Sequence, residues 1–344
     1  MSISSKLFKH VDIGIDLGAA NMRVWVAGEG LALEEPSAVA IAVPHNVEEK
    51  DSTDERHGEQ ESKPSAKSCK FRILAIGAEA CRMYGKTPGN LVVIRPMKDG
   101  VICDYDITEK MLCYCFAKEK VKKACMGRLR RPRAVIAVPF GITEVEKRAL
   151  EEAAHSAGAG DVFLVEAPMT AAIGAGLPVS EPKGCMIVDI GAFATNMAVI
   201  SLGGIVHSNV LRIGGDAMNN AIVAYLREKY NLLAGEREAE DIKIKIGTAC
   251  TPDKELGHEI NGIDATEGRK LVVKIDSKEI REEALAGLLA QIEDALRGFI
   301  ARIAPRTRRR HRGQWHCPDG RRCASAWNRQ AARRCDRSAR PSGQ

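Results

Sequence analysis

Residues 11–28, VDIGIDLGAANMRVWVAG, decide the fold. Apolar residues alternate with polar or small ones on both sides of the turn 18–21, which predicts two antiparallel strands joined by a tight connection. Residues 185–204, CMIVDIGAFATNMAVISLGG, repeat this pattern about half a chain later. Two such hairpins indicate an α/β protein with two related halves, and a ligand held between the halves would contact both turns.

The two turns share a chemistry that suits phosphate. Small residues let backbone N–H groups approach phosphate oxygens closely. Asp16 and Asp189 stand directly before the turns, where a carboxylate can orient water around a bound Mg²⁺. A single copy of this pattern equally fits an ordinary hairpin. The second copy in an equivalent hairpin favours a phosphate and magnesium site.

The composition is that of a globular protein of two domains. The chain has 344 residues, of which 45% are hydrophobic and 28% charged, as in ordinary soluble proteins. No apolar run approaches the roughly 20 residues of a membrane span, and the N-terminus lacks the apolar core of a signal peptide. The eleven cysteines form no CxxC pair, which argues against disulfide and zinc chemistry. We therefore expect a cytoplasmic protein.

Local signals divide the chain further. Residues 44–70 are polar and aperiodic, which indicates a surface loop between two strands. Thr143 and Glu146 fit a helix-capping box, and Gly158 fits the end of the same helix. We expect a first half over residues 1–150, a second half over 151–303 and a separate basic tail over 304–344.

Several ordered segments resemble one family. They are DIGIDLGAAN, GEGLALEEPSAVAI, GKTPGNLVVIRPMKDGVICDYDITEKML, RPRAVIAVPFGITEVEKRALEEAA, AAIGAGLPVSEPKGCMIVDIG, ISLGGIVHSNVLRIGGDAMNNAI and KYNLLAGEREAEDIKIKIG. Together they resemble the MreB family of the actin-like ATPase superfamily, from about residue 11 to about residue 303. The resemblance implies an α/β actin-like (RNase H-like) fold, with two halves around a central nucleotide cleft and an incomplete C-terminal element.

The resemblance also implies a binding site for ATP and Mg²⁺. Asp16 and Asp189 would act in catalysis and hold the metal through water. The nucleotide-contacting positions would be Gly18, Ala19, Ala20 and Asn21 in the first turn, Gly191, Ala192, Phe193, Ala194 and Thr195 in the second, Gly214, Gly215 and Asp216 near the ribose and phosphates, and Glu240, Asp241, Ile242 and Lys243 beside the nucleoside. Glu240 and Lys243 lie on one helical face, where they also fit a solvated ion pair.

The function implied by the resemblance is ATP-dependent filament assembly beneath the cytoplasmic membrane, which controls cell shape and wall synthesis. The expected partners are copies of the chain, an intact MreB, membrane morphogenesis proteins and the inner membrane surface, with no nucleic acid. Leu7 and Phe8 either contact that surface or merely lead into the first strand. Two alternatives stay open: a non-hydrolysing scaffold or inactive paralogue of MreB, and a small-molecule kinase on the same fold.

Three positions depart from the family pattern. The family usually reads GTANT in the first turn, where this chain has Ala19, and DIGGGTT in the second, where it has Phe193. The family's EEP triplet is here Glu166-Ala167-Pro168, so the carboxylate that would position the attacking water is missing. Such groups contribute roughly 10²–10⁴-fold in rate. We expect weak nucleotide binding and a weak ATPase at most.

The tail departs most. Residues 306–344 carry twelve arginines and two aspartates, whereas the rest of the chain is mildly acidic. One choice of codons for residues 313–324, read one nucleotide later, encodes DNGIVLTGGGA, which resembles the family's missing DxGIVLTGGGALL. We therefore expect a frameshifted, disordered tail, a missing final strand and an exposed sheet edge. The alternatives are a basic segment for nucleic acid or anionic lipid and a zinc cluster, whose spacing fits no standard finger.

Overall fold

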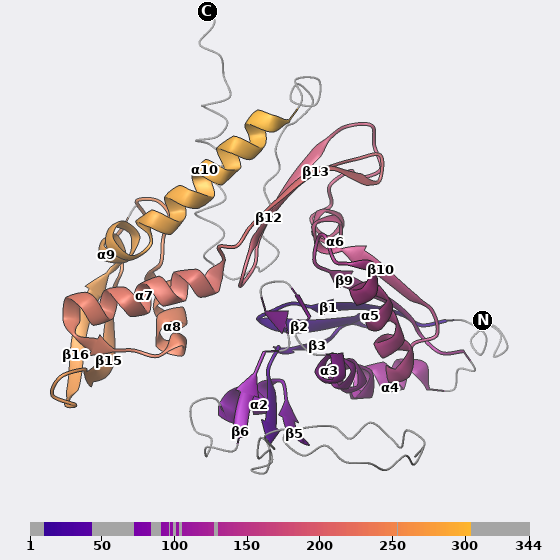
Figure 1. Cartoon of the computed structure of the whole chain (residues 1–344), viewed down its shortest axis with the longest axis horizontal. Helices are drawn as coiled ribbons and strands as arrows, with labels where there is room; N and C mark the ends of the chain where they lie inside the picture. Colours follow the sequence, from indigo (N-terminus) through magenta and orange to yellow (C-terminus); the bar gives the residue numbers. More distant parts are fainter. Residues whose placement is uncertain are drawn as a thin grey trace, which may run out of the picture. The chain divides into compact units, whose positions relative to one another are not determined.

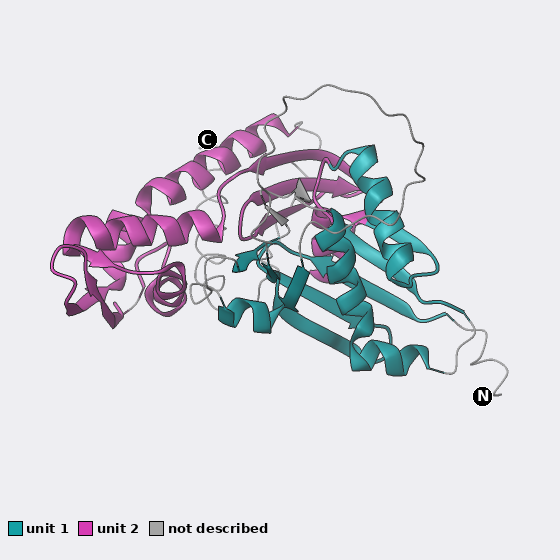
Figure 2. Ribbon diagram, turned by 60° about the horizontal axis from the view of Figure 1, so that its bottom comes forward, with its two compact units in different colours: residues 1–137, 142–164 teal, residues 138–141, 165–344 magenta. Residues whose placement is uncertain are grey.

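The computed structural model describes residues 10–42, 72–83, 91–95, 97–98, 101–102, 105–126, 130–252 and 254–303. The predicted loop 44–70, the segment with Leu7 and Phe8, and the basic tail lie outside these residues. The chain divides into two compact units, residues 1–137 with 142–164 and residues 138–141 with 165–344 (Figure 2). The first unit continues beyond the boundary of 150 expected from the sequence, because the helix around residue 150 packs within that unit.

The first unit contains a five-stranded sheet and a smaller, three-stranded sheet (Figure 1). Its elements are β1 (Asp12–Leu17), β2 (Asn21–Val26), β3 (Gly30–Pro36), β4 (Val39–Ala42), β5 (Arg72–Ile76), α2 (Ala78–Met83), β6 (Leu91–Ile94), β7 (Met97–Lys98), β8 (Val101–Ile102), α3 (Tyr105–Ala117), α4 (Glu119–Cys125), β9 (Arg133–Val138), α5 (Glu144–Ala157) and β10 (Val162–Glu166).

The predicted first hairpin forms the middle of the large sheet. The strand order is β10-β9-β1-β2-β3, and β4 lies between β5 and β6 in the smaller sheet. β1 pairs antiparallel with β2 and parallel with β9. In β1 the residues Ile13, Ile15 and Leu17 are buried, whereas those between them are partly exposed. The alternation that predicted the strand is therefore the alternation of its two faces.

Helix α5 begins and ends as the sequence predicts. The Glu146 N–H donates to the Thr143 hydroxyl at 3.3 Å, and the Thr143 N–H donates to the Glu146 carboxylate at 2.8 Å. This reciprocal pair satisfies two N–H groups that the first helical turn leaves without partners. Gly158 ends the helix with φ 118°, a backbone conformation that glycine adopts without steric cost.

The second unit contains two three-stranded sheets and a set of longer helices (Figure 1). Its elements are α6 (Ala167–Gly174), β11 (Cys185–Ile190), β12 (Thr195–Ser201), β13 (Gly204–Leu211), α7 (Gly215–Tyr230), β14 (Leu232–Leu233), α8 (Glu236–Ile246), β15 (Gly257–Asp264), β16 (Lys270–Asp276), α9 (Ser277–Glu279), the π-helical turn η1 (Ile280–Ala284) and α10 (Ala286–Arg302).

The sheet β11-β12-β13 is covered on both faces. On one face Ile187, Ala198 and Ile200 pack with Ala172 of α6 and with Leu177. On the other face Val188, Met197 and Val199 pack with Leu296 and Phe299 of α10. Because neighbouring residues of one strand point to opposite faces, each strand contributes to both cores.

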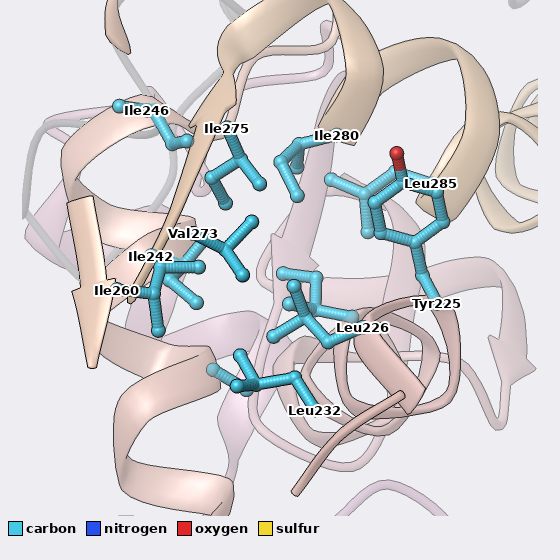
Figure 3. Packing of buried hydrophobic residues seen from close by; sticks show 12 residues of the cluster. Tyr225, Leu226, Leu232, Ile242, Ile246, Ile260, Val273, Ile275, Ile280 and Leu285 are labelled. Carbon is cyan, nitrogen blue, oxygen red and sulfur yellow. The ribbon is translucent and has the colours of Figure 1, made fainter. Parts of the chain in front are cut away.

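The sheet β14-β15-β16 shares its core with α7, α8 and η1 (Figure 3). Leu226 of α7, Ile242 of α8 and Ile260 of β15 point toward one another there, with Ile275 and Ile280 beside them. Each of these five side chains is at most 4% exposed. This core packs the second half of α7 against α8 and the small sheet.

The structure confirms the internal repeat. β1-β2-β3 and β11-β12-β13 are both antiparallel meanders whose first strand has six residues. The two sheets differ at one edge. β1 has β9 as a second neighbour, whereas among the described residues no strand pairs with the other edge of β11.

Candidate functional site

The first turn is held from behind by the connection between β3 and β4. The hydroxyl of buried Ser37 donates to the Gly18 carbonyl at 2.5 Å, and the Ser37 N–H donates to the Ala20 carbonyl at 2.9 Å. A Cβ atom on Gly18 would lie 2.6 Å from the Asn21 carbonyl oxygen. Only glycine fits this position without a shift of the backbone.

An arginine lies beside the first turn. Asp16 and Arg23 are direct partners in the antiparallel register, and their side chains form an ion pair at 3.7 Å. Arg23 also donates to Glu34 at 3.3 Å. Sequence reasoning missed Arg23, although the hairpin register alone places it opposite Asp16. It puts a positive charge beside the carboxylate expected to face the metal and its waters.

The carboxylate of Glu35 holds β3, the strand that supports this turn, in place. Glu35 of β3 accepts hydrogen bonds from Tyr114 and Lys118 at 2.7 Å each, and from the Ala78 N–H at 3.3 Å. Burial alone would raise the pKa of Glu35, but these hydrogen bonds, led by that of Lys118, outweigh burial and lower it. Gly77 must be glycine, since its Cβ would overlap the Glu35 carboxylate.

The second turn is tied to the beginning of α7. The Gly191 N–H donates to the Ala194 carbonyl at 2.8 Å and closes the turn. The N–H groups of Gly215 and Asp216 then donate to the carbonyls of Gly191 and Ala192, at 3.0 and 2.8 Å. These bonds bring the second turn and the predicted segment 214–216 together within one unit.

Three further contacts fix this arrangement. A Cβ on Gly214 would lie 2.5 Å from the Ala192 carbonyl oxygen, so the backbones touch and only glycine fits. The hydroxyl of fully buried Thr195 donates to the Ile213 carbonyl at 2.7 Å. The Lys243 ammonium, from α8, donates to the Gly215 carbonyl at 3.0 Å. Lys243 therefore lies at the same place as the turn and the helix start.

The remaining predicted residues have different environments. Glu240 and Asp241 are exposed on α8, whereas the Ile242 side chain is 1% exposed and belongs to the subdomain core. Asp189 is partly buried in β11. Phe193 is partly buried and keeps a negative φ, because among the described non-glycine residues only Leu202 and Asn231 have positive values. The backbone of Phe193 is therefore not in the left-handed region.

The described residues contain no group of three or more His, Cys, Asp or Glu side chains that could hold a metal ion by themselves. None of the helices in this part of the chain is long and apolar enough to span a bilayer.

The duplicated meander defines the class of the protein, and solved structures agree. MreB5 of Spiroplasma citri bound to AMPPNP superimposes with a TM-score of 0.76 at 29% identity, over 90% of this chain and 85% of that chain. The MamK double helical filament has a TM-score of 0.68 at 19% identity, over 95% and 92%. The fold is actin-like.

Sequence comparisons identify the family within this class. The profile of the MreB/Mbl protein family matches residues 59–307. The cell shape-determining protein MreB of Escherichia coli K12 is 45% identical over 288 residues, which cover 83% of this chain and 76% of that protein. The cell shape-determining protein Mbl of Bacillus subtilis 168 is 42% identical over 294 residues, 86% and 79% of the two chains. The chain belongs to the MreB/Mbl family.

Proposed function

We propose that this chain is a cell-shape cytoskeletal protein. It binds ATP with Mg²⁺ and assembles with copies of itself into filaments, in the cytoplasm at the inner face of the membrane. The observation that carries the proposal is the tie between the second turn, the start of α7 and Lys243, in a chain of the MreB/Mbl family. Its named relatives determine cell shape, and MreB5 of Spiroplasma citri is solved with AMPPNP and with ADP.

The residues present fit a nucleotide in most respects. Gly18 and Gly214 hold their turns in tightly packed shapes without side chains, which lets phosphate oxygens approach the backbone. Asp16 and Asp189 would orient the waters of the metal, which offsets phosphate charge when it is bound. Lys243 would contribute a positive charge close to the phosphates or the ribose.

Other residues fit less well, and they weaken the site without removing it. The methyl group of Ala192 and the ring of Phe193 occupy positions where the family carries glycines. A bulky ring in a phosphate turn restricts the approach of the ligand. We therefore propose that nucleotide binding is retained but impaired.

Ala167 limits hydrolysis in this proposal. It follows Glu166, at the end of β10, and is the first residue of α6. A methyl group cannot align or deprotonate water, so turnover is slow or absent. A non-hydrolysing scaffold that assembles together with an intact MreB stays a second candidate function.

Calorimetric titration with Mg-ATP tests the binding part of the proposal. We expect the wild-type affinity to be weaker than about 1 μM, roughly −8 kcal/mol. Restoring the glycines with Ala192→Gly and Phe193→Gly should tighten it, since the phosphates then approach the backbone.

The matched control for this titration is Leu202→Gly. Leu202 lies in the turn between β12 and β13 and has φ 54°, so glycine fits there without loss of structure. This variant adds flexibility to the same sheet away from the second turn and should leave the affinity unchanged. Wild-type binding much tighter than micromolar would contradict impaired binding, and no binding by either protein would contradict a nucleotide site.

A further inference from the structure

A row of three charged residues crosses the five-stranded sheet beside the first turn. In the antiparallel register, Arg23 of β2 lies opposite Asp16 of β1 on one side and opposite Glu34 of β3 on the other. Residues paired in this way have Cβ atoms about 4.5–5.5 Å apart, so their side chains meet on one face of the sheet. The neighbours of Arg23 in β2, Met22 and Val24, are buried on the opposite face. The register therefore places a guanidinium between two carboxylates.

The guanidinium contacts the two carboxylates through different nitrogen atoms. Its Nη1 lies 3.7 Å from Asp16 Oδ2, and its Nε donates to Glu34 Oε1 at 3.3 Å. The side chain of Arg23 is 22% exposed, against 48% for Asp16 and 37% for Glu34. Glu34 thus holds one end of the planar group while the other end meets Asp16, whose carboxylate keeps a side open to water.

Asp16 is the member of the row that can act on a ligand. It lies two residues before Gly18, whose carbonyl accepts the hydrogen bond of Ser37. A carboxylate at a metal site is oriented by its own hydrogen-bond and ion-pair partners, and the loss of such a partner typically costs about 10–100-fold in metal affinity. An arginine suits this task, since its nitrogens have fixed relative positions that a lysine lacks.

The charges of the row fit a metal better than a phosphate. Asp16, Arg23 and Glu34 together carry one net negative charge at neutral pH, so the row attracts a cation rather than an anion. Arg23 is engaged by both carboxylates. Its geometry therefore suits the orientation of Asp16 rather than a direct contact with the nucleotide.

We propose that Arg23 is a positioning residue, which bridges Glu34 and Asp16 and thereby orients the Asp16 carboxylate toward the waters of the Mg²⁺ that accompanies ATP. The inference rests on the proposed function, because it assigns a role at the same nucleotide site. Arg23 acts through Asp16, so its contribution is a part of the affinity that Mg²⁺ adds to nucleotide binding.

The experiment measures the affinity of the full chain for ATP by calorimetry, once with excess Mg²⁺ and once with EDTA. The ratio of the two dissociation constants, the Mg²⁺ gain, reports on Asp16, whereas the affinity in EDTA reports on the charge at the site. Arg23→Lys keeps the charge, but a single ammonium cannot reproduce the two contacts of the guanidinium. We expect an unchanged affinity in EDTA and a Mg²⁺ gain about tenfold smaller.

Glu34→Gln is a second variant that leaves Arg23 itself in place. It weakens the hold on one end of the guanidinium, so the Mg²⁺ gain should fall in the same direction. The affinity in EDTA should not fall, because a negative charge is removed from the neighbourhood of the phosphates. Melting temperatures without nucleotide, close to that of the wild type, establish that both variants are folded.

Arg133→Met is the matched control. Arg133 of β9 forms the same kind of cross-strand ion pair with Asp12, at 2.6 Å, at the other end of β1. Asp12 and Asp16 are four residues apart on the same face of β1, about 13 Å along the strand. This distance exceeds the screening length of roughly 8–10 Å at physiological salt, so the control should keep both the affinity in EDTA and the Mg²⁺ gain.

The outcomes separate the positioning role from the proposed function. An unchanged Mg²⁺ gain in Arg23→Lys and Glu34→Gln, or an equal loss in Arg133→Met, would overturn the positioning role alone. An equal loss of affinity with Mg²⁺ and with EDTA in Arg23→Lys would assign the arginine to the phosphates and would also overturn it. No binding of ATP by the wild type under either condition would contradict the proposed function, and the inference with it.

Discussion

At the scale of single residues, Ala167 gives the sharpest prediction. Ala167→Glu restores a carboxylate at the first position of α6, where it can align the attacking water. Water positioning is worth roughly 10²–10⁴-fold, so phosphate release from Mg-ATP should rise by about that range if the turns hold the nucleotide. The assay is phosphate release under saturating Mg-ATP.

Ala167→Gln is the matched control for this variant. It adds nearly the same volume and a polar amide without a basic carboxylate, so its rate should stay near that of the wild type. Equal rates for the Glu and Gln variants would show that the carboxylate does not act on water. A wild-type rate equal to that of an intact MreB would contradict the slow hydrolysis proposed for this chain.

Some site residues could be predicted from the sequence and others could not. The two turns and the capping box at Thr143 depend on neighbours within a few residues, so local patterns reveal them. The Lys118 bond to Glu35 joins residues 83 positions apart, and the Lys243 bond to Gly215 joins residues 28 apart. Only the three-dimensional packing brings such pairs together, although the resemblance had already singled out Lys243.

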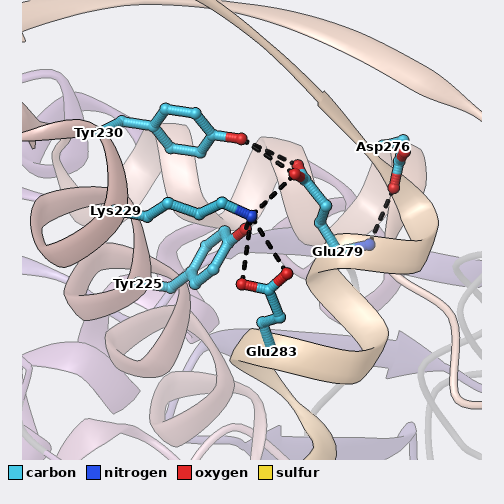
Figure 4. Close-up of polar contacts among 6 residues, drawn as sticks. All are labelled: Tyr225, Lys229, Tyr230, Asp276, Glu279 and Glu283. Carbon is cyan, nitrogen blue, oxygen red and sulfur yellow. Dashed lines mark hydrogen bonds and ion pairs between the residues drawn. The ribbon is translucent and has the colours of Figure 1, made fainter.

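At the scale of elements, a polar cluster connects α7 to the segment after β16 (Figure 4). The Lys229 ammonium donates to Glu279 at 2.9 Å, to both oxygens of Glu283 at 3.1 Å and to the Tyr225 hydroxyl at 2.8 Å. The Tyr230 hydroxyl donates to Glu279 at 3.0 Å. The hydrogen bond with Tyr225, followed by those with the two carboxylates, raises the pKa of Lys229.

This cluster predicts a late ionisation of the Tyr230 phenol. Burial, followed by the hydrogen bond to the Glu279 carboxylate, raises the pKa of Tyr230 to about 12 from an ordinary value of 10.0. A raised pKa stabilises the fold below the ordinary value, and that contribution is lost as the pH rises from 10 through 12. The tyrosinate absorbance of wild type minus Tyr230→Phe should therefore show one ionisation near pH 12.

Glu279→Gln is the test of the cause. It removes the negative charge beside the phenol, so the Tyr230 ionisation should move down toward its ordinary value. Because α9 keeps its Asp276 cap, at 2.8 Å from the Glu279 N–H, the helix itself should remain. An ionisation near pH 10 in the wild type would show that the cluster does not form.

At the scale of the whole molecule, the sequence predicted the architecture because the chain repeats itself. Two hairpins with the same turn chemistry implied two related halves, and the sheets β1-β2-β3 and β11-β12-β13 are those hairpins with one strand added. The boundary between the units was less predictable, because α5 packs on α3, more than 25 residues earlier in the chain.

Filament formation by the purified chain is the most direct test of the proposed function. Sedimentation with and without Mg-ATP, followed by electron microscopy of the pellet, should show polymer that depends on the nucleotide. Lys243→Met should reduce this dependence, because it removes the charge beside Gly215. Lys245→Met, on the exposed side of the same helix, should not. A chain that stays in the supernatant with Mg-ATP, both alone and mixed with an intact MreB, would contradict the proposal.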